Sequence, residues 1–442
     1  MRWPQADRVN LKTALAHIAV LLAAGSLLAA ETGGGANRFW PQWRGPLCSG
    51  VGPEADPPLQ WSETHNVKWK VALPGDGNST PIVWGNRVFI LTAVPLGSPG
   101  APAPASDVPT EQYQFLVLCF DRQTGKVLWQ KIARQEVPHE GHQQNNTYAS
   151  ASPVTDGKLV CAFFGSRGLH CYDVEGNLKW EKDFGKMKTK MGFGEGSSPA
   201  LYGDAVVVYW DQEGDDFITA MDKQTGKELW RQPRHESTGW STPLVVEHDG
   251  HPQVIVNATG KVCSYDLATG HLLWECGGQT ANAIPTPVAS HDVAYVTSGF
   301  RGSALEAIKL GRTGDLTGTD AILWSQHKDT PYVPSPLLVD NFLYVVAGND
   351  PVLSCFDADS GRPEFSHERL AGIYAIYASP VAARDRIYVL SREGVCLVLK
   401  KGSKPEILAT NKLEDHTDAS PALVGREIFI RGHHNLYCIA AP

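Results

Sequence analysis

The hydrophobic positions of this chain fall into short runs of strand length that are separated by polar turns. The clearest unit runs from Leu116 to Gln130, where an apolar run is followed by a polar turn with Thr124 and Gly125, and then by a second run that carries Trp129. The Asp that opens the turn can accept backbone N–H groups, and Gly tolerates a positive φ. This pattern predicts a β-hairpin with one large aromatic on its second strand.

The same hairpin pattern recurs along the chain. Clear copies run from Cys171 to Trp180, from Thr219 to Trp230 and from Ser264 to Trp274. A stretched copy lies between Ala307 and Trp324, and Phe365 replaces the tryptophan in a further copy. We expect the tryptophans to be structural wedges, largely buried between neighbouring units. The tryptophans concerned are Trp129, Trp180, Trp230, Trp274 and Trp324.

A second mark precedes each hairpin, a Ser or Thr followed by Pro at the start of an apolar run. The eight prolines are Pro81, Pro153, Pro199, Pro243, Pro287, Pro336, Pro380 and Pro421. Their spacings are 72, 46, 44, 44, 49, 44 and 41 residues. A period near 44 residues with about four short strands per unit is typical of propeller blades. The sequence therefore predicts an all-β fold, an eight-bladed β-propeller of four-stranded antiparallel blades.

The last repeat shows only three strands after Pro421, whereas a strand without neighbours runs from Asn66 to Leu73 before the first repeat. We predict that this N-terminal strand, with Trp69, becomes the fourth strand of the last blade. Ring closure of this kind removes the open sheet edges that would otherwise invite association.

Residues 1–30 have the pattern of a secretory signal peptide. Arg2, Arg8 and Lys12 precede an apolar run from Ile18 to Ala24, and small residues follow before Glu31. We predict a periplasmic or extracellular protein with no transmembrane segment in the mature chain, and an uncleaved N-terminal anchor stays open as the alternative. Loss of three basic residues and one acid changes the formal charge from −8 to −10, which argues against nucleic acid as a partner.

Residues 31–60 form a leader rich in Gly, Pro and Trp, and residues 61–442 form the propeller. The leader contains Phe39, Trp40 and Trp43 close together. We expect these aromatics to dock on the flank of the propeller, with stacking on a ligand left open, and we expect the protein to be a monomer.

Nine cysteines in an exported chain suggest disulfides, but their positions favour buried thiols. Cys119, Cys171 and Cys355 each lie two residues before a turn Asp, and Cys438 has the same place in the last repeat. They are predicted to fill one small core position in different blades, where pairing is geometrically unfavourable. Whether Cys161 and Cys171, on successive strands of one blade, are paired stays open.

The repeats differ from one another mainly in their connections. With the strands of a blade named a to d in chain order, the d-to-a and b-to-c loops of a propeller emerge on one face, and the Asp-x-x-Thr-Gly hairpins on the other. Variety of charge and aromaticity at one concave place favours selective recognition. We expect the Pro-rich loop 94–112 to overhang this mouth as a partial lid. The predicted ligand-binding rim consists of His142, Tyr148, Glu195, His235, Trp240, Tyr332, Tyr377, His416 and Asp418.

Other polar clusters have structural interpretations that we favour. The segment His139–His142 is not an H-E-x-x-H motif, because its histidines are three residues apart. The acidic segment Asp211–Asp216 lacks the final Glu of a calcium loop and favours a charged hairpin tip. No catalytic or metal-binding residue is predicted, although a metal site that includes His235 or His416 stays open. We interpret three arginines as exposed turn residues, and a joint binding site for an anionic ligand stays open as the alternative. They are Arg167, Arg301 and Arg392.

The blade pattern resembles the pyrroloquinoline-quinone-like (PQQ-like) repeat. The resemblance is carried by Cys171-Tyr172-Asp173 and by the segment from Asp222 through Thr225 and Gly226 to Trp230, and it covers residues 61–442. That family includes quinoprotein alcohol dehydrogenases and the BamB-type propeller of the outer-membrane barrel assembly machinery. The resemblance implies the propeller fold, whereas its motif residues are turn formers and wedges that say almost nothing about activity.

The resemblance to the dehydrogenases implies PQQ and Ca²⁺ held by Glu, Asn and Asp side chains beside a catalytic Asp, with the quinone stacked on two adjacent, disulfide-linked cysteines. This chain has no two adjacent cysteines and no C-x-x-C-H haem site. We therefore predict a non-catalytic exported propeller, without a cofactor, that binds a protein, peptide or glycan at the channel mouth. The alternative is a PQQ-dependent alcohol or sugar dehydrogenase.

Overall fold

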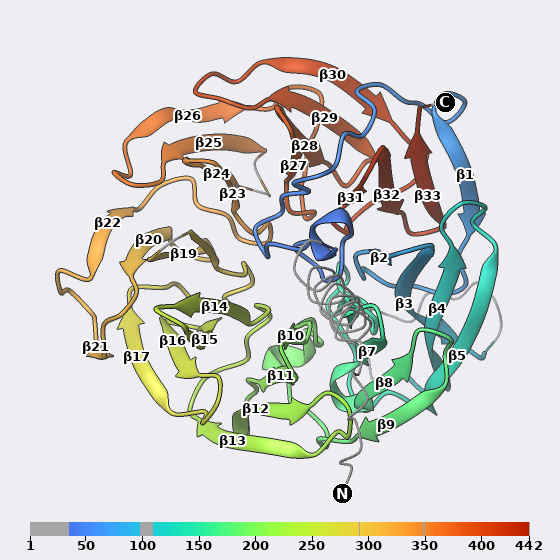
Figure 1. The fold of residues 1–442 in the computed structure, drawn as a ribbon, viewed down its shortest axis with the longest axis horizontal. Helices are drawn as coiled ribbons and strands as arrows, with labels where there is room; N and C mark the ends of the chain where they lie inside the picture. The colour runs from blue at the N-terminus through green and yellow to red at the C-terminus, as the bar shows by residue number, and fades with distance from the viewer. Residues whose placement is uncertain (1–34, 98–108, 291, 348, 350, 442) are drawn as a thin grey trace, which may run out of the picture.

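The computed structural model describes residues 35–97, 109–290, 292–347, 349 and 351–441. Eight β-sheets, each forming one blade, are arranged in a ring around a central axis (Figure 1). The predicted eight-bladed propeller is thus confirmed. The predicted signal peptide, residues 1–30, and residues 98–108 of the predicted lid lie outside the described part of the chain.

Blades one to four follow the chain from the inner strand outward. Blade one consists of β2 (Ile82–Trp84), β3 (Arg87–Pro95), β4 (Tyr113–Asp121) and β5 (Val127–Glu136). Blade two consists of β6 (Val154–Thr155), β7 (Leu159–Phe163), β8 (Leu169–Asp173) and β9 (Leu178–Lys182). Blade three consists of β10 (Ala200–Tyr202), β11 (Ala205–Trp210), β12 (Asp216–Asp222) and β13 (Glu228–Arg234). Blade four consists of β14 (Leu244–His248), β15 (His251–Asn257), β16 (Lys261–Asp266) and β17 (Leu272–Gly277).

Blades five to seven repeat this order. Blade five consists of β18 (Val288–Ser290), β19 (Val293–Ser298), β20 (Ala304–Lys309) and β22 (Ile322–Gln326). Blade six consists of β23 (Leu337–Val339), β24 (Phe342–Ala347), β25 (Val352–Asp357) and β26 (Pro363–Arg369). Blade seven consists of β27 (Val381–Ala383), β28 (Arg386–Leu390), β29 (Val395–Lys400) and β30 (Ile407–Lys412). Short 3-10 helices lie in connections at η1 (Ala36–Arg38), η2 (Gly165–Arg167) and η3 (Lys190–Gly192).

The N-terminal strand closes the ring as predicted. Blade eight contains β31 (Ala422–Val424), β32 (Glu427–Arg431) and β33 (Asn435–Ala440), and its outer strand is β1 (Val67–Ala72). Trp69 of β1 lies opposite Cys438 of β33 in an antiparallel ladder. The first and last repeats are therefore held together by backbone hydrogen bonds, and blade eight has no open outer edge where β33 would otherwise end the sheet.

Two local departures from the predicted strands are seen. Strand β3 continues through Val94 and Pro95, which pair with Gln114 and Tyr113, so the predicted loop 94–112 begins two residues too early. The insertion in blade five adds a strand, β21 (Gly314–Asp315), that pairs in parallel with β17 of blade four. This insertion therefore packs against a neighbouring blade.

Trp69 and four of the five predicted wedge tryptophans connect their own blade to the next one. In each of these, the indole N–H donates to the backbone carbonyl of the residue after the turn Asp of the following blade, which satisfies the polar atom of a large apolar side chain. Trp180, Trp230 and Trp274 are buried as predicted, whereas Trp129 and Trp324 are half-buried. The five donor–acceptor pairs are Trp69 to Arg122 (2.9 Å), Trp129 to Val174 (3.0 Å), Trp180 to Lys223 (2.8 Å), Trp230 to Leu267 (2.7 Å) and Trp324 to Ala358 (2.9 Å).

The glycine of the next turn lies directly against this indole. Gly226 has φ +68°, and a Cβ added there would lie 2.6 Å from the ring of Trp180. A side chain at Gly226 would therefore be excluded both by backbone conformation and by the close approach of the wedge. Trp274 differs, because its indole donates to Gln253 of its own blade at 3.0 Å and the inserted Leu316 packs in the same apolar cluster.

Hydrogen bonds to the turn aspartates make the stability of the fold depend on pH. In the hairpin of blade three, Asp222 Oδ1 accepts Thr225 Oγ1 at 2.7 Å and the Thr225 backbone N–H at 2.8 Å. The hydroxyl hydrogen bond lowers the pKa of Asp222, and Thr124 and Ser360 do the same for the pKa values of Asp121 and Asp357. Unfolded aspartates titrate near pH ~3.9, so this stabilisation is complete above that pH and is lost as the pH falls further.

We therefore expect the melting temperature to fall as the pH is lowered from about 5 to about 2. In the triple variant Asp121→Asn/Asp222→Asn/Asp357→Asn, which retains turn-forming side chains, this fall should be shallower. Calorimetry or circular dichroism melts across the pH series would measure it. An identical slope in both proteins would show that the turns do not contribute to acid sensitivity.

One cysteine pair forms a disulfide. Cys161 of β7 and Cys171 of β8 lie directly opposite each other and are bonded, so the favoured interpretation as free thiols is wrong for this pair. The other seven cysteines are free. Cys119, Cys355 and Cys438 face the wedge position of strand d in their blades, as the common core position predicted.

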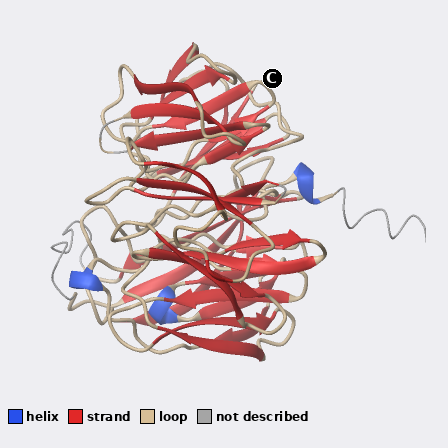
Figure 2. Ribbon diagram, turned by 90° about the vertical axis from the view of Figure 1, so that its left-hand side faces the viewer, coloured by secondary structure: helices blue, strands red, loops and turns tan. Residues whose placement is uncertain are grey.

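The two faces of the ring carry different connections. Helix η2 is the b-to-c turn of blade two, and η3 lies in the d-to-a loop between blades two and three. Figure 2, an edge-on view, shows η1 on one face and these two helices toward the other. No helix in the described ranges is long and apolar enough to cross a membrane.

Candidate functional site

A ring of Ser and Thr hydroxyls lines the inner ends of the blades. For seven of the eight prolines, the backbone N–H of the preceding residue donates to the hydroxyl of the corresponding residue in the next blade, at 2.8–3.1 Å. Seven such links run in order through Thr80, Ser152, Ser198, Thr242, Thr286, Ser335, Ser379 and Ser420. The Thr80 hydroxyl, at the start of this series, is buried without a partner in the described structure. The Ser/Thr-Pro mark is therefore a link between blades as well as a strand start.

The leader lies in the central channel, so the predicted docking on the flank is wrong. Trp40, fully buried, exchanges backbone hydrogen bonds of 2.9 and 2.8 Å with Val83 of the inner strand β2. Arg44, only 2% exposed, donates to the carbonyls of Pro336 (2.9 Å) and Pro380 (3.0 Å). The inner ends of blades six and seven present these carbonyls without a ladder partner, which is why a buried guanidinium is stable there.

The leader also reaches the hydroxyl ring. The indole N–H of Trp43 donates to Ser420 Oγ at 3.3 Å. From the centre the leader runs outward to β1 at the perimeter (Figure 1). Trp43 thus ties the leader to the inner end of blade eight.

Trp43 and part of the hydroxyl ring line a cavity of about 320 Å³ at the mouth of the channel. We call this cavity the mouth pocket. Its aromatic lining consists of Trp43, Phe193, Trp240, Phe300, Tyr332 and Tyr377. Its side-chain amides are Asn78, Gln143, Asn145 and Asn146. Its hydroxyls are Ser150, Ser152, Ser198, Thr242 and Ser420, and its single charged lining residue is Asp418.

The aromatic side chains are held in fixed orientations by their neighbours. Phe300 and Tyr332 stack with ring centroids 5.1 Å apart. Trp240 donates its indole N–H to Gly194 O at 2.7 Å, and the ring centroids of Trp240 and Phe193 are 6.5 Å apart. Such preorganised aromatic faces bind ligand surfaces at a low cost in side-chain entropy.

The long loop between blades one and two crosses part of the mouth. Asn145 in this loop donates to Tyr377 Oη at 3.2 Å and accepts from Arg392 Nη2 at 3.0 Å. The guanidinium of Arg392 also lies 4.1 Å from the centroid of the Tyr377 ring. Arg392 donates to both carboxylate oxygens of Asp418, with Nε to Oδ1 at 2.6 Å and Nη2 to Oδ2 at 3.1 Å.

The charge of Asp418 is compensated inside the protein. Burial opposes ionisation of Asp418, but hydrogen bonds from His416, His433 and Arg392 hold its pKa well below the usual range. The mouth pocket therefore presents aromatic faces, amides and hydroxyls to a ligand, and no unpaired charge.

Comparison with known proteins identifies the family of this propeller. A family model described as "Outer membrane protein assembly factor BamB" matches residues 114–367, which is more than half of the chain. The chain belongs to this PQQ-like, BamB-type family. A comparison with curated proteins finds no match.

Solved structures similar to this BamB-type propeller include a BamB protein and dehydrogenases. BamB from Moraxella catarrhalis is 13% identical, with a TM-score of 0.58 over 84% of this chain and 98% of that one. A quinohemoprotein alcohol dehydrogenase from Comamonas testosteroni is 10% identical, with a TM-score of 0.60 over 94% and 82%. A europium-containing methanol dehydrogenase is also 10% identical, with a TM-score of 0.63 over 92% and 99%. At such identities the likeness shows the fold alone.

The mouth pocket does not fit the quinone cofactor that the dehydrogenase relatives imply. Asp418 is the only carboxylate in the lining, so the pocket lacks the several carboxylate oxygens that a calcium ion requires. The lining contains no cation for an anionic quinone and no cysteine. The one disulfide, Cys161–Cys171, lies buried between β7 and β8.

The structure brings together part of the predicted rim of the BamB-type propeller. Trp240, Tyr332, Tyr377 and Asp418 line the mouth pocket. His416 lies beside Asp418 on the rim, and His235 is exposed.

Three other predicted rim residues have structural contacts. Glu195 accepts the Ser166 backbone N–H and hydroxyl at 2.7 and 2.6 Å and so fixes η2. Tyr148 donates to Glu140 O at 2.9 Å, and His142 packs edge-on against it with ring centroids 4.5 Å apart.

The acidic segment Asp211–Asp216 forms the b-to-c turn of blade three as interpreted, with Glu213 and Asp215 exposed at its tip. Asp211 itself is buried, because its carboxylate pairs with the Arg234 guanidinium at 2.6 and 2.9 Å. Arg167 is no exposed turn residue, because it is 4% exposed and donates to Glu195 at 3.2 Å. Arg301 lies over Phe300, so the three turn arginines have separate partners and form no common anion grip.

Sequence reasoning missed the amides and the leader as parts of the site. Asn145 and Asn146 follow His139 and His142 in the same loop. The candidate residues were sought among the histidines, but the asparagine side chains line the pocket. The Ser and Thr residues before the prolines were visible as a mark but not as pocket lining. Trp43 could not be placed, because nothing in its local sequence distinguishes a channel from a flank.

Proposed function

We propose that this protein is an exported, non-catalytic scaffold that binds an uncharged stretch of a protein, peptide or glycan in the mouth pocket. The observation that carries the proposal is the lining itself, six aromatic side chains and four amides around a cavity whose only charged residue is already paired. Aromatic faces stack on apolar surfaces of side chains or sugars, and amides donate and accept hydrogen bonds at once. Such a lining selects for polar but neutral groups.

Export is supported by three features. Residues 1–30 have the composition of a secretory signal. The Cys161–Cys171 disulfide is typical of an oxidising compartment. The matching family model is described as an outer membrane assembly factor. We propose that the mature protein is periplasmic or extracellular and monomeric.

Variants of the pocket test this proposal. We expect Trp240→Ala/Tyr332→Ala to weaken ligand binding by about tenfold to a hundredfold, because loss of central aromatic anchors removes roughly 1.4–2.8 kcal/mol. The matched control is Arg312→Ala/Asp315→Ala, which changes two exposed residues in the hairpin insertion on the opposite face. Immobilised wild-type and variant proteins would be compared for retention of material from an envelope extract.

Protease and glycosidase treatment of the retained material then identifies a peptide or a glycan. Retention that is reduced only by the pocket variant supports the proposal. Equal retention by all three proteins, or loss only from the control variant, would contradict it. A visible spectrum and dye reduction after addition of PQQ and Ca²⁺ test the dehydrogenase alternative directly, and we expect neither a bound chromophore nor turnover.

A further inference from the structure

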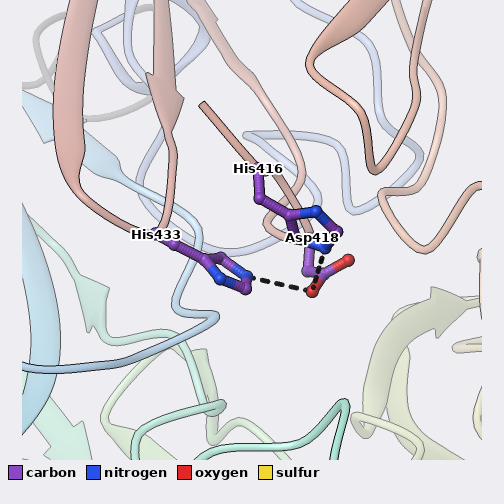
Figure 3. A group of neighbouring side chains, drawn as sticks. All are labelled: His416, Asp418 and His433. Atoms are coloured by element: carbon purple, nitrogen blue, oxygen red, sulfur yellow. Dashed lines mark hydrogen bonds and ion pairs between the residues drawn. The ribbon is translucent and has the colours of Figure 1, made fainter. Parts of the chain in front are cut away.

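Three side chains with metal-ligating atoms meet on the rim beside the mouth pocket: His416, Asp418 and His433 (Figure 3). Asp418 Oδ2 lies 3.1 Å from His433 Nε2 and 3.5 Å from His416 Nε2. One ligand atom from each residue lies within 4.8 Å of the other two. Ligands about 2.0–2.1 Å from a tetrahedral zinc ion are roughly 3.3 Å apart. The separations from the carboxylate oxygen to both imidazoles therefore match those of a metal site.

The backbone that carries these side chains is fixed by hydrogen bonds. The N–H of His433 donates to His416 O at 2.8 Å, which joins the two segments. Asp415 accepts the backbone N–H groups of His434 and Asn435 at 3.2 and 3.0 Å and so shapes the turn after His433. A site whose ligands are held in place before an ion binds loses little entropy on binding.

The segment that carries Asp418 is held equally firmly. Thr417 donates its backbone N–H to Arg392 O at 3.0 Å and its hydroxyl to Ser391 O at 2.6 Å. Arg392 itself orients the Asp418 carboxylate through two hydrogen bonds of 2.6 and 3.1 Å. Its positive charge opposes that of a metal ion, so we expect a dissociation constant of about 1–100 µM rather than the tight binding of a structural zinc site.

We propose that His416, Asp418 and His433 bind one divalent transition-metal ion, with Zn²⁺ as the representative ion. Two imidazole nitrogens and one carboxylate oxygen suit Zn²⁺, Ni²⁺ or Cu²⁺, whereas Ca²⁺ and Mg²⁺ take oxygen ligands. The side chains of His416 and His433 are 40% and 36% exposed, so the ion enters from solvent. Three protein ligands leave a coordination position open. Because Asp418 also lines the mouth pocket, the ion lies at the wall of that pocket.

Calorimetric titration of the chelator-treated mature protein with ZnCl₂ tests the site without any knowledge of the pocket's ligand. We expect one ion per chain, with no corresponding binding of CaCl₂. His416→Ala/His433→Ala should weaken zinc binding at least about a hundredfold, since it leaves only one protein ligand. The matched control is His235→Ala/His434→Ala, which removes two exposed histidines and should bind zinc like the wild type.

Melting temperatures separate loss of the site from loss of the fold. Without metal, the His416→Ala/His433→Ala variant should melt within about 2 °C of the wild type, because half-exposed side chains contribute little to stability. Zinc should raise the melting temperature of the wild type and of the control but not of this variant. Absence of zinc binding to the wild type, or equal binding by the His416→Ala/His433→Ala variant, would overturn the proposal. Neither result would bear on ligand binding by the aromatic lining.

Discussion

A chain that begins at residue 74 should aggregate or unfold, and should not form a stable monomer. The truncation removes β1, and with it the antiparallel partner of β33, so blade eight gains an open edge that can pair with other chains. It also removes Trp69, which is 8% exposed and donates to Arg122 O in blade one. Loss of one buried tryptophan costs roughly 3–5 kcal/mol, a large part of the stability of a typical domain. Size-exclusion chromatography and thermal melts would measure the effect.

A chain that begins at residue 61 is the matched comparison. It keeps β1 and Trp69 but loses the leader, including the buried Arg44 and Trp40 in the channel. We expect this protein to remain a monomer with a lower melting temperature, since the ring is closed but its channel is no longer filled. A monomer beginning at residue 74 with an unchanged melting temperature would contradict closure of the ring by β1.

Trp230→Ala should lower the free energy of unfolding by about 3–5 kcal/mol, because the side chain is a wedge between blades three and four. Trp230 is 8% exposed, and its indole N–H donates to Leu267 O at 2.7 Å. A Cβ at Gly270 of the next blade would lie 2.5 Å from its ring, which shows how closely the blades approach there. Urea denaturation followed by fluorescence and circular dichroism would give the value.

Two neighbouring substitutions separate the contributions at this wedge. Leu229→Ala, at a side chain that is 52% exposed, should change the stability by no more than about 0.5 kcal/mol. Trp230→Phe retains much of the apolar contact but loses the hydrogen bond, so we expect an intermediate loss. If Trp230→Ala left stability unchanged and instead abolished ligand binding, the wedge assignment would be wrong.

The fold could be predicted because the same sequence pattern recurs from blade to blade. The Asp-x-x-Thr-Gly turns and the Ser/Thr-Pro strand starts are local signals. The Ser/Thr-Pro mark occurs eight times, which makes the repeat clear although the first spacing is irregular. The missing strand of the last repeat and the solitary strand with Trp69 together indicated closure. The inserted β21 escaped prediction, because Gly314 and Asp315 have little strand propensity and pair only through the neighbouring blade.

The site could be predicted only in part, because it is built from contacts between distant loops. Asn145 meets Arg392 across 247 residues, and Trp43 meets Ser420 across 377. No local pattern encodes either contact. His433, in the turn between β32 and β33, joins His416 and Asp418, which lie in the loop between β30 and β31. The strand order predicts which face of the ring carries the d-to-a loops. Which side chains reach the centre of that face depends on the conformation of the loops, which the sequence pattern does not predict.

Site-specific photo-crosslinking tests most directly whether the mouth pocket binds a ligand. A photoreactive amino acid at Gln143, an exposed residue that lines the pocket, would be compared with one at Arg312 on the opposite face, in cells that export the protein. We expect a discrete adduct from position 143, none from position 312, and loss of the adduct when Trp240→Ala/Tyr332→Ala is added. No adduct from position 143, or the same adduct from position 312, would contradict the proposed function.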